Sequence, residues 1–410
     1  MEVKHPLWTK NFTILTLGTV VSMLGNAVSG FAIGLLVLDY TGSTLLYAIF
    51  TVSYNLPKLI MPSLVGPYLD RFSRVKVIYM LDFLSAGLYL FMFGALSFDW
   101  LSYPLLLILC IVIGCVDSFY LVAYDSLYPT LISEGNFSKA YSISSMLYPL
   151  SALMVPVAAW CYENVGIEPL FLFNAATFLI AAIFETQIKT EETHMSSAPE
   201  KYDKGRYLSD FREGISYLRA EKGLLFITAY FLINTLVFSA SGTLLLPYFK
   251  ATEGLGVQVY TYVMGCSLIG RLIGGFMHYK FRYPAHLKFA IAFFVYVASG
   301  LIESFYLFLP VLAMMALQLF SGMICVTSFN IRISSTQNHV PNEMRGRFNG
   351  VFQMLTNVGS IVGALAAGAL GDLLPMRPVI MCFGLLGVLS AFAIMLPGSK
   401  HVREIYNVDV

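Results

Sequence analysis

Long apolar stretches separated by short polar connections dominate the sequence. A bilayer core about 30 Å thick requires roughly 20 mostly apolar residues in one helix. The chain contains twelve stretches of about that length. They predict an all-α membrane protein, with transmembrane helices at residues 12–38, 44–69, 76–97, 102–125, 138–161, 167–187, 223–249, 256–279, 286–307, 309–331, 345–372 and 377–397.

The distribution of basic residues supports this number of spans. If the N-terminus lies inside, 21 of the 25 Lys and Arg residues fall in connections on the inner side of the membrane. Only Lys250 and Arg377 fall outside, while Lys58 and Arg271 lie within spans. Basic residues concentrate on the cytoplasmic side of membrane proteins, and a missing span would reverse every later connection. We therefore expect a multi-pass protein of the cell membrane with both termini in the cytoplasm.

The longest polar stretch, residues 188–222, divides the chain into halves of six spans each. The expected domains are an N-terminal six-helix bundle at 1–187, this cytoplasmic linker, a C-terminal six-helix bundle at 223–397 and a cytoplasmic tail at 398–410. Two pseudo-symmetric halves around a central site are usual in secondary transporters, in which one half rocks against the other.

The linker contains apolar residues at helical spacing, namely Leu208, Phe211, Ile215 and Leu218. Charged residues fill the positions between them, which is the pattern of an amphipathic helix. Two placements fit this pattern. The helix lies on the inner membrane surface, or it is a linker helix packed against the protein.

The composition agrees with a lipid environment and narrows the function. Of the 410 residues, 57% are hydrophobic and 12% charged, whereas soluble chains carry about 25% charged residues. The formal net charge of +1 gives no reason to expect a nucleic-acid partner. The sequence has no CxxC pair, no GxSxG or HExxH string, no Walker A string and no histidine deep in a span. We therefore expect no enzyme activity, no cofactor and no metal site.

The connection after the second span carries an ordered string of glycine and charged residues. Its members at the inner mouth are Gly66, Asp70, Arg71 and Arg74. Asp70 suits the positive N-terminal end of a neighbouring helix, and the two arginines suit a carboxylate such as Asp82. We interpret these residues, with Arg347 before the eleventh span, as a conformational latch that holds one state of the protein. The alternative is an ordinary basic turn.

This string resembles the signature loop of the major facilitator superfamily. Four other stretches are similar to the branch that contains macrolide-type drug exporters and enterobactin-type siderophore exporters: residues 124–131, 171–179, 212–218 and 337–347. The resemblance covers nearly the whole chain. It implies twelve helices in two pseudo-symmetric bundles, a central cavity and, often, proton antiport.

Three positions depart from the family pattern. The corresponding loop after the eighth span, residues 275–282, has basic residues but no Asp. In the fifth span, residues 155–160 lack the paired glycines of the antiporter signature, which weakens the usual marker of export. Asn26 stands where relatives commonly have an Asp, and an amide cannot carry a proton through a transport cycle.

Charged residues inside spans are costly and therefore informative. Lys58 and Asp117 have opposite charges and lie at about the same depth in the first half, each 12 residues before the inner mouth. We expect them to pair or to share a water-filled pocket, and Asp117 is then the best candidate for a proton carrier. The alternative is that each satisfies a separate polar group. Asp82 and Glu185, near the inner ends of their spans, are interpreted as interfacial or structural.

Polar residues on helical faces indicate a substrate cavity. Its predicted residues are Asn26, Tyr54, Asn55, Tyr120, Tyr124, Tyr148, Asn234, Arg271, Gln353 and Asn357. A cavity rich in aromatic residues and poor in charge suits a bulky, largely apolar solute. Arg271 attracts an anionic substrate group or reaches a polar partner in the protein. The alternative for the other residues is that they hold helices together.

We therefore expect a monomeric secondary transporter, surrounded by membrane lipid, that works by alternating access. The expected function is proton-coupled efflux of an amphipathic small molecule, a drug or a secreted metabolite. An importer of a nutrient or organic ion is the alternative, with Arg271 as the anchor of the substrate. A non-transporting membrane receptor or a lipid scramblase is an alternative from a different class.

Overall fold

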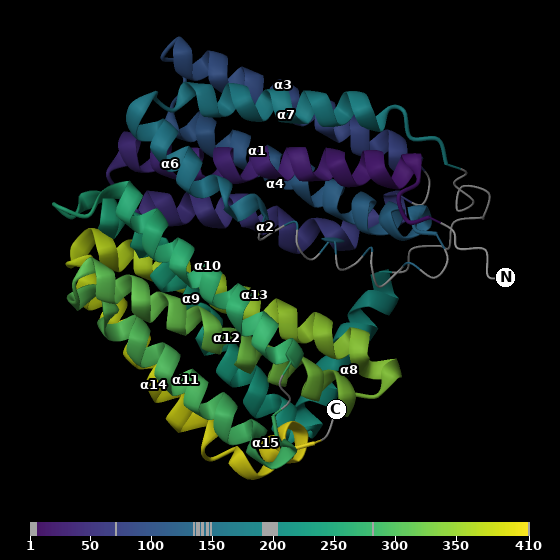
Figure 1. The fold of residues 1–410 in the computed structure, drawn as a ribbon. Coiled ribbons are helices and arrows are strands. Elements are labelled where there is room, and N and C mark those ends of the chain that lie inside the picture. The colour runs from purple at the N-terminus through teal and green to yellow at the C-terminus, as the bar shows by residue number, and fades with distance from the viewer. Residues whose placement is uncertain are drawn as a thin grey trace. The chain divides into compact units, whose positions relative to one another are not determined.

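The computed structural model describes residues 6–69, 72–133, 150–190, 204–280 and 283–408, with the single residues 136, 140, 143, 144 and 147. All regular secondary structure in this part of the chain is helical (Figure 1), as the sequence predicts. The chain divides into two compact units. The first comprises Met1–Gly42 and Phe50–Tyr202, and the second comprises Ser43–Ile49 and Asp203–Val410.

The first unit contains the helices of the N-terminal half. They are α1 (Lys10–Thr41), α2 (Thr44–Leu69), α3 (Arg74–Ser97), α4 (Tyr103–Leu127), α6 (Met154–Asn164) and α7 (Glu168–Glu185). Local signals explain the ends of α1: the Thr9 side chain accepts a hydrogen bond from the Phe12 amide, and Gly42 ends the helix with a φ of 60°. This left-handed conformation is one that glycine adopts without strain. The first residues of α2 belong to the second unit.

The second unit contains the remaining helices. They are α8 (Lys204–Ala220), α9 (Lys222–Ala251), α10 (Gly256–Lys280), α11 (Lys288–Phe305), α12 (Val311–His339), α13 (Asn342–Leu373), α14 (Met376–Ser390) and α15 (Ser399–Tyr406). The predicted division at Pro310 is confirmed, because α11 ends at Phe305 and Pro310 directly precedes α12. Proline has no amide hydrogen to continue a helix, but it is well suited to begin one.

Ten helices of the described residues are long and apolar enough to cross a membrane, and they match ten of the twelve predicted spans. The predicted span 44–69 coincides with α2, whose side chains from residue 62 onward lie outside the described part. Most of the predicted span 138–161 also lies outside it, and α6 covers its last residues.

The linker helix α8 packs against protein. Leu218 is buried, and Phe211 and Ile215 pack against the hydrophobic core of the second unit. A Cβ atom added to Gly214 would lie 2.8 Å from the carbonyl oxygen of Arg347 on α13, so the two backbones are in close contact. Of the two placements that the sequence allows, the structure therefore shows the packed linker helix.

In the first unit, α7 lies between α1 and α3 (Figure 1). Against α3, the rings of Tyr89 and Phe178 stack with centroids 5.7 Å apart. Against α1, the Asn174 amide donates a hydrogen bond of 2.6 Å to the Ser29 hydroxyl. Gly25 lets α1 approach, because a Cβ at this position would overlap the Asn174 side chain. These contacts hold α1, α3 and α7 together around a cavity.

Candidate functional site

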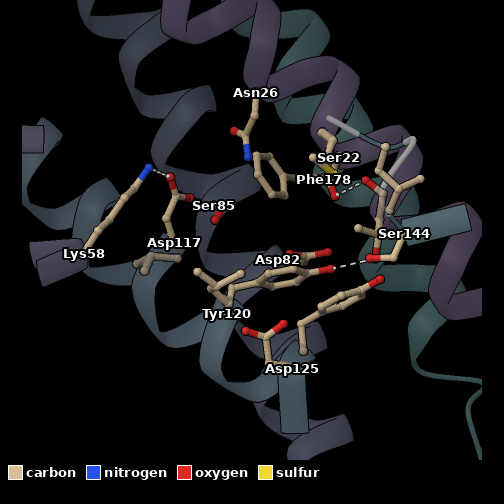
Figure 2. A pocket seen from close by; sticks show the side chains of 16 residues that line it. Ser22, Asn26, Lys58, Asp82, Ser85, Asp117, Tyr120, Asp125, Ser144 and Phe178 are labelled. Carbon is tan, nitrogen blue, oxygen red and sulfur yellow. Dashed lines mark hydrogen bonds and ion pairs between the residues drawn. The ribbon is translucent and has the colours of Figure 1, made fainter. Parts of the chain in front are cut away.

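A cavity of about 440 Å³ lies within the first unit (Figure 2). Side chains from α1, α2, α3, α4 and α7 line it, together with Ser144 and Leu147. The charged residues among them are Lys58, Asp82, Asp117 and Asp125. A cavity with charged groups inside an otherwise apolar helix bundle is the usual setting of a transport site in a membrane protein.

Lys58 and Asp117 form an ion pair at one side of the cavity (Figure 2). The Lys58 Nζ lies 3.4 Å from the Asp117 Oδ2, and the two side chains are 35% and 17% exposed. The Tyr54 hydroxyl donates a 2.7 Å hydrogen bond to the same carboxylate oxygen. The helices that carry these residues approach closely at Gly114, where a Cβ would overlap the Tyr54 carbonyl oxygen. The sequence therefore correctly predicted that these two charges lie together.

The opposite wall of the cavity is aromatic and polar. The Tyr120 hydroxyl lies 3.2 Å from the Thr19 Oγ1. The Tyr120 and Tyr124 rings stack with centroids 6.2 Å apart, and both residues line the cavity with Asn26. Stacked rings offer a flat apolar surface, whereas the hydroxyl and amide groups at its edges can orient a bound molecule.

The other predicted cavity residues of the first half are placed differently. Tyr54 contacts the cavity through its hydrogen bond to Asp117. Asn55 is exposed, and its amide donates to the Thr51 carbonyl oxygen at 2.8 Å on its own helix. Tyr148 lies outside the described residues.

Four predicted cavity residues lie in the second unit. The Asn234 amide is 3.4 Å from the Tyr230 hydroxyl, and Gln353 donates to Asn357 at 3.1 Å on α13. Arg271 is exposed on α10. The hydrogen bonds of Asn234 and Gln353 connect positions one turn apart on a helix, which is the spacing of side chains that share a face.

The predicted latch is only partly within the described residues. Asp70 and Arg71 lie outside them, and Gly66 lies in α2. Arg74 begins α3 and donates to the Ser126 carbonyl oxygen at 3.1 Å. Arg347 forms an ion pair of 3.1 Å with Glu213 of α8.

The expected partner of the arginines, Asp82, is placed elsewhere. Both of its carboxylate oxygens lack a hydrogen-bond partner, so a hydrogen-bonded pair between Asp82 and Arg74 is not formed and that expectation is wrong. Asp82 instead faces Glu185 of α7. Of the interfacial and structural interpretations of these acids, the structure favours the structural one, because they are 1% and 0% exposed.

An all-helical membrane protein with a cavity that contains charged groups inside one helical unit has the features of a membrane transporter. Residues 15–356 match the Major Facilitator Superfamily, and the chain therefore belongs to this family of transporters. The family resemblance recognised in the sequence motifs is confirmed.

Similar proteins and solved structures support this assignment. The chain is 25% identical over 358 residues to the uncharacterized MFS-type transporter YkuC of Bacillus subtilis, covering 83% of this chain and 81% of that protein. It is 21% identical over 419 residues to macrolide efflux protein A of Streptococcus pyogenes, covering 98% and 99%. A solved structure of a bacterial homologue of the iron transporter ferroportin shares the fold, with a TM-score of 0.70 and 16% identity over 95% of this chain and 98% of that one.

Proposed function

We propose that the protein is a secondary active exporter of the cell membrane, which moves an amphipathic small molecule outward in exchange for protons by alternating access. The similarity to macrolide efflux protein A extends over almost the full length of both chains and supports efflux. In this proposal the bundles at 1–187 and 223–397 are the two moving halves, the protein works as a monomer, and both termini lie in the cytoplasm.

The observation that carries the proposal is the ion pair of Lys58 and Asp117 at the cavity. When Asp117 is ionised, the two charges compensate each other. When Asp117 binds a proton, the positive charge of Lys58 is left uncompensated, so each proton changes the net charge of the cavity by one unit. A carboxyl group that is only partly exposed can exchange its proton with water in the cavity, which is what a proton carrier requires.

The aromatic wall supplies the surface for the transported molecule. Tyr120, Tyr124 and Asn26 line the same cavity as the ion pair, so a bulky solute lying on the rings is next to the charge that changes. In this proposal protonation and substrate occupancy compete through the charge of the cavity. Coupling of this kind needs no direct contact between the proton and the substrate.

The latch is proposed to act at the inner mouth, with Gly66, Asp70, Arg71 and Arg74 on one side. The ion pair between Arg347 and Glu213 supports a role for Arg347, since it holds the start of α13 against the linker helix α8. The pair is exposed by 32% and 53%, and such pairs are weak enough to open during a transport cycle.

The test is transport by purified protein in liposomes, with a radiolabelled macrolide as the probe and a pH gradient as the driving force. We expect Asp117→Asn to reduce gradient-driven accumulation by at least about tenfold, because an amide cannot release a proton. Asp39→Asn is the matched control. Asp39 also accepts a 2.7 Å hydrogen bond from a tyrosine hydroxyl, that of Tyr162, but it does not line this cavity. The control should keep wild-type accumulation.

Three results would contradict the proposal, at two levels. If Asp117→Asn accumulated the probe to the wild-type level, Asp117 would not be the proton carrier. Movement of the probe only in the inward direction, or the same accumulation with and without a gradient in the wild type, would remove proton-coupled efflux itself.

A further inference from the structure

A second pair of ionisable groups lies deep in the first unit. Asp82 of α3 and Glu185 of α7 are 1% and 0% exposed, and their helices pack along each other (Figure 1). The two carboxyl groups are close enough to interact electrostatically. The ion pair of Lys58 and Asp117 does not include either of them.

Neither carboxyl group receives a hydrogen bond from the surrounding protein. All four of their oxygen atoms are buried without a partner, and no lysine, arginine or histidine in the described part of the chain forms a salt bridge with them. An ionised carboxylate is only an acceptor. Two ionised carboxylates here would repel each other without water or a donor. One proton removes the conflict, because the protonated group becomes the donor to its neighbour.

The neighbouring helices leave room for the pair without adding a compensating charge. On α1, Gly18 faces Glu185, and a Cβ at this position would lie 2.9 Å from the Glu185 Oε1. Between Lys10 and Asp39, α1 has no titratable residue. On α4, the titratable groups in electrostatic contact with the pair are Tyr120 and Asp117.

Asp82 connects the buried pair to the cavity. It lines the cavity with Tyr120, and Figure 2 shows both side chains at the edge of the same space. Glu185, in contrast, does not line it. Of the two groups, Asp82 is therefore the one through which the pair can exchange a proton with the cavity.

We propose that Asp82 and Glu185 form a proton-binding site, in which the two carboxyl groups share one proton that exchanges with the cavity at Asp82. This site is separate from Asp117. It depends neither on the direction of transport nor on the identity of the transported molecule.

The experiment is a pH titration of the purified protein in lipid by difference infrared spectroscopy, without substrate or gradient. The wild type should retain the carbonyl stretching band of a protonated carboxylic acid at neutral pH and lose it as the pH rises. Glu185→Gln should lose this component at neutral pH, because the glutamine amide donates a hydrogen bond to an ionised Asp82. Asp82→Asn should also lose this band, because the asparagine amide donates a hydrogen bond to an ionised Glu185. Asp117→Asn should keep the band.

A thermal measurement gives an independent readout. The folded wild type holds a proton that the unfolded chain releases at neutral pH, so its stability should fall as the pH rises. Glu185→Gln should melt without this part of the pH dependence, since its hydrogen-bond donor does not titrate.

A wild-type spectrum without the band at neutral pH overturns the proposal, and so does a band that persists in both Glu185→Gln and Asp82→Asn. If Glu185→Gln does not fold, Asp82→Asn alone decides. Loss of transport in Asp117→Asn with the band intact would concern only the proposed export function, so the two proposals fail separately.

Discussion

The packing of α10 against α12 depends on glycines that face backbone rather than side chains. A Cβ added to Gly270 would meet the Leu319 carbonyl oxygen, and one added to Gly322 would meet the Ser267 carbonyl oxygen, both closer than the 3.0 Å that real Cβ atoms respect. Gly274, one turn further along α10, faces the Met323 carbonyl oxygen in the same way. In Gly270→Ala, the helices must therefore separate by more than an ångström to reach ordinary contact.

The cost follows from two opposing terms. Overpacking of a close contact costs about 1–3 kcal/mol, because neighbouring groups must shift. The opposing atom is a helical carbonyl oxygen, which cannot rotate away as a side chain can. The gain from replacing glycine by alanine within a helix is about 1 kcal/mol. The net loss is then at most about 2 kcal/mol, or up to about 8 °C in melting temperature for a unit of this size.

The assay is thermal unfolding of the purified protein in detergent, comparing Gly270→Ala with Gly275→Ala. Gly275 lies on the same helix, but a Cβ there would have no atom within 4 Å. The control should therefore melt at or slightly above the wild-type temperature. Equal melting temperatures for the two variants, or a more stable Gly270→Ala, would show that the close backbone contact does not govern this packing.

Two further substitutions test contacts of the second unit. The Arg332 guanidinium lies 4.8 Å from the ring centres of two phenylalanines. Arg332→Lys keeps the charge but loses the planar stacking, so it should lower the melting temperature by the equivalent of about 1 kcal/mol. The control Arg271→Lys, on the exposed side of α10, should leave the melting temperature unchanged. Equal effects of the two substitutions would contradict this reasoning. Asp372 accepts hydrogen bonds from the amides of Thr44 at 2.6 Å and Leu45 at 3.4 Å. Asp372→Ala should cost about 0.5–2 kcal/mol as a lost helix cap, and hydrogen exchange of the first turn of α2 should accelerate about tenfold; unchanged exchange would refute the capping role.

The fold could be predicted from the sequence because a bilayer requires each transmembrane helix to have a certain length and an apolar composition. Ten predicted spans coincide with helices of the described residues that are long and apolar enough. Even the weakest boundary, near Pro310, was placed correctly, since α11 ends at Phe305 and Pro310 directly precedes α12. The position of α8 was not accessible in the same way, since an amphipathic pattern shows an apolar face but not which surface covers it.

The two pairs of charged residues in the first unit show where prediction from sequence ends. Lys58 and Asp117 could be matched because helical rise converts residue number into depth, and opposite charges at one depth attract. Asp82 and Glu185 could not be matched in this way. Their residue numbers place both near the inner ends of their spans but do not indicate which faces of α3 and α7 are in contact. Only packing, through the approach of α1 at Gly18 and the stacking of Tyr89 on Phe178, turns both acids inward.

The two kinds of helix contact respond differently to protons. The glycine contacts between α10 and α12 are steric and uncharged, so their strength is the same at every pH. The contact between α3 and α7 includes two buried carboxyl groups. With the proposed shared proton they would form a hydrogen bond, and without it they would repel each other. An uncompensated buried charge costs several kcal/mol, and only water entry or separation of the two helices relieves that cost. In the proposed site, release of the proton from Asp82 into the cavity would therefore weaken the packing of α3 on α7 and so couple proton binding to helix movement in the first unit.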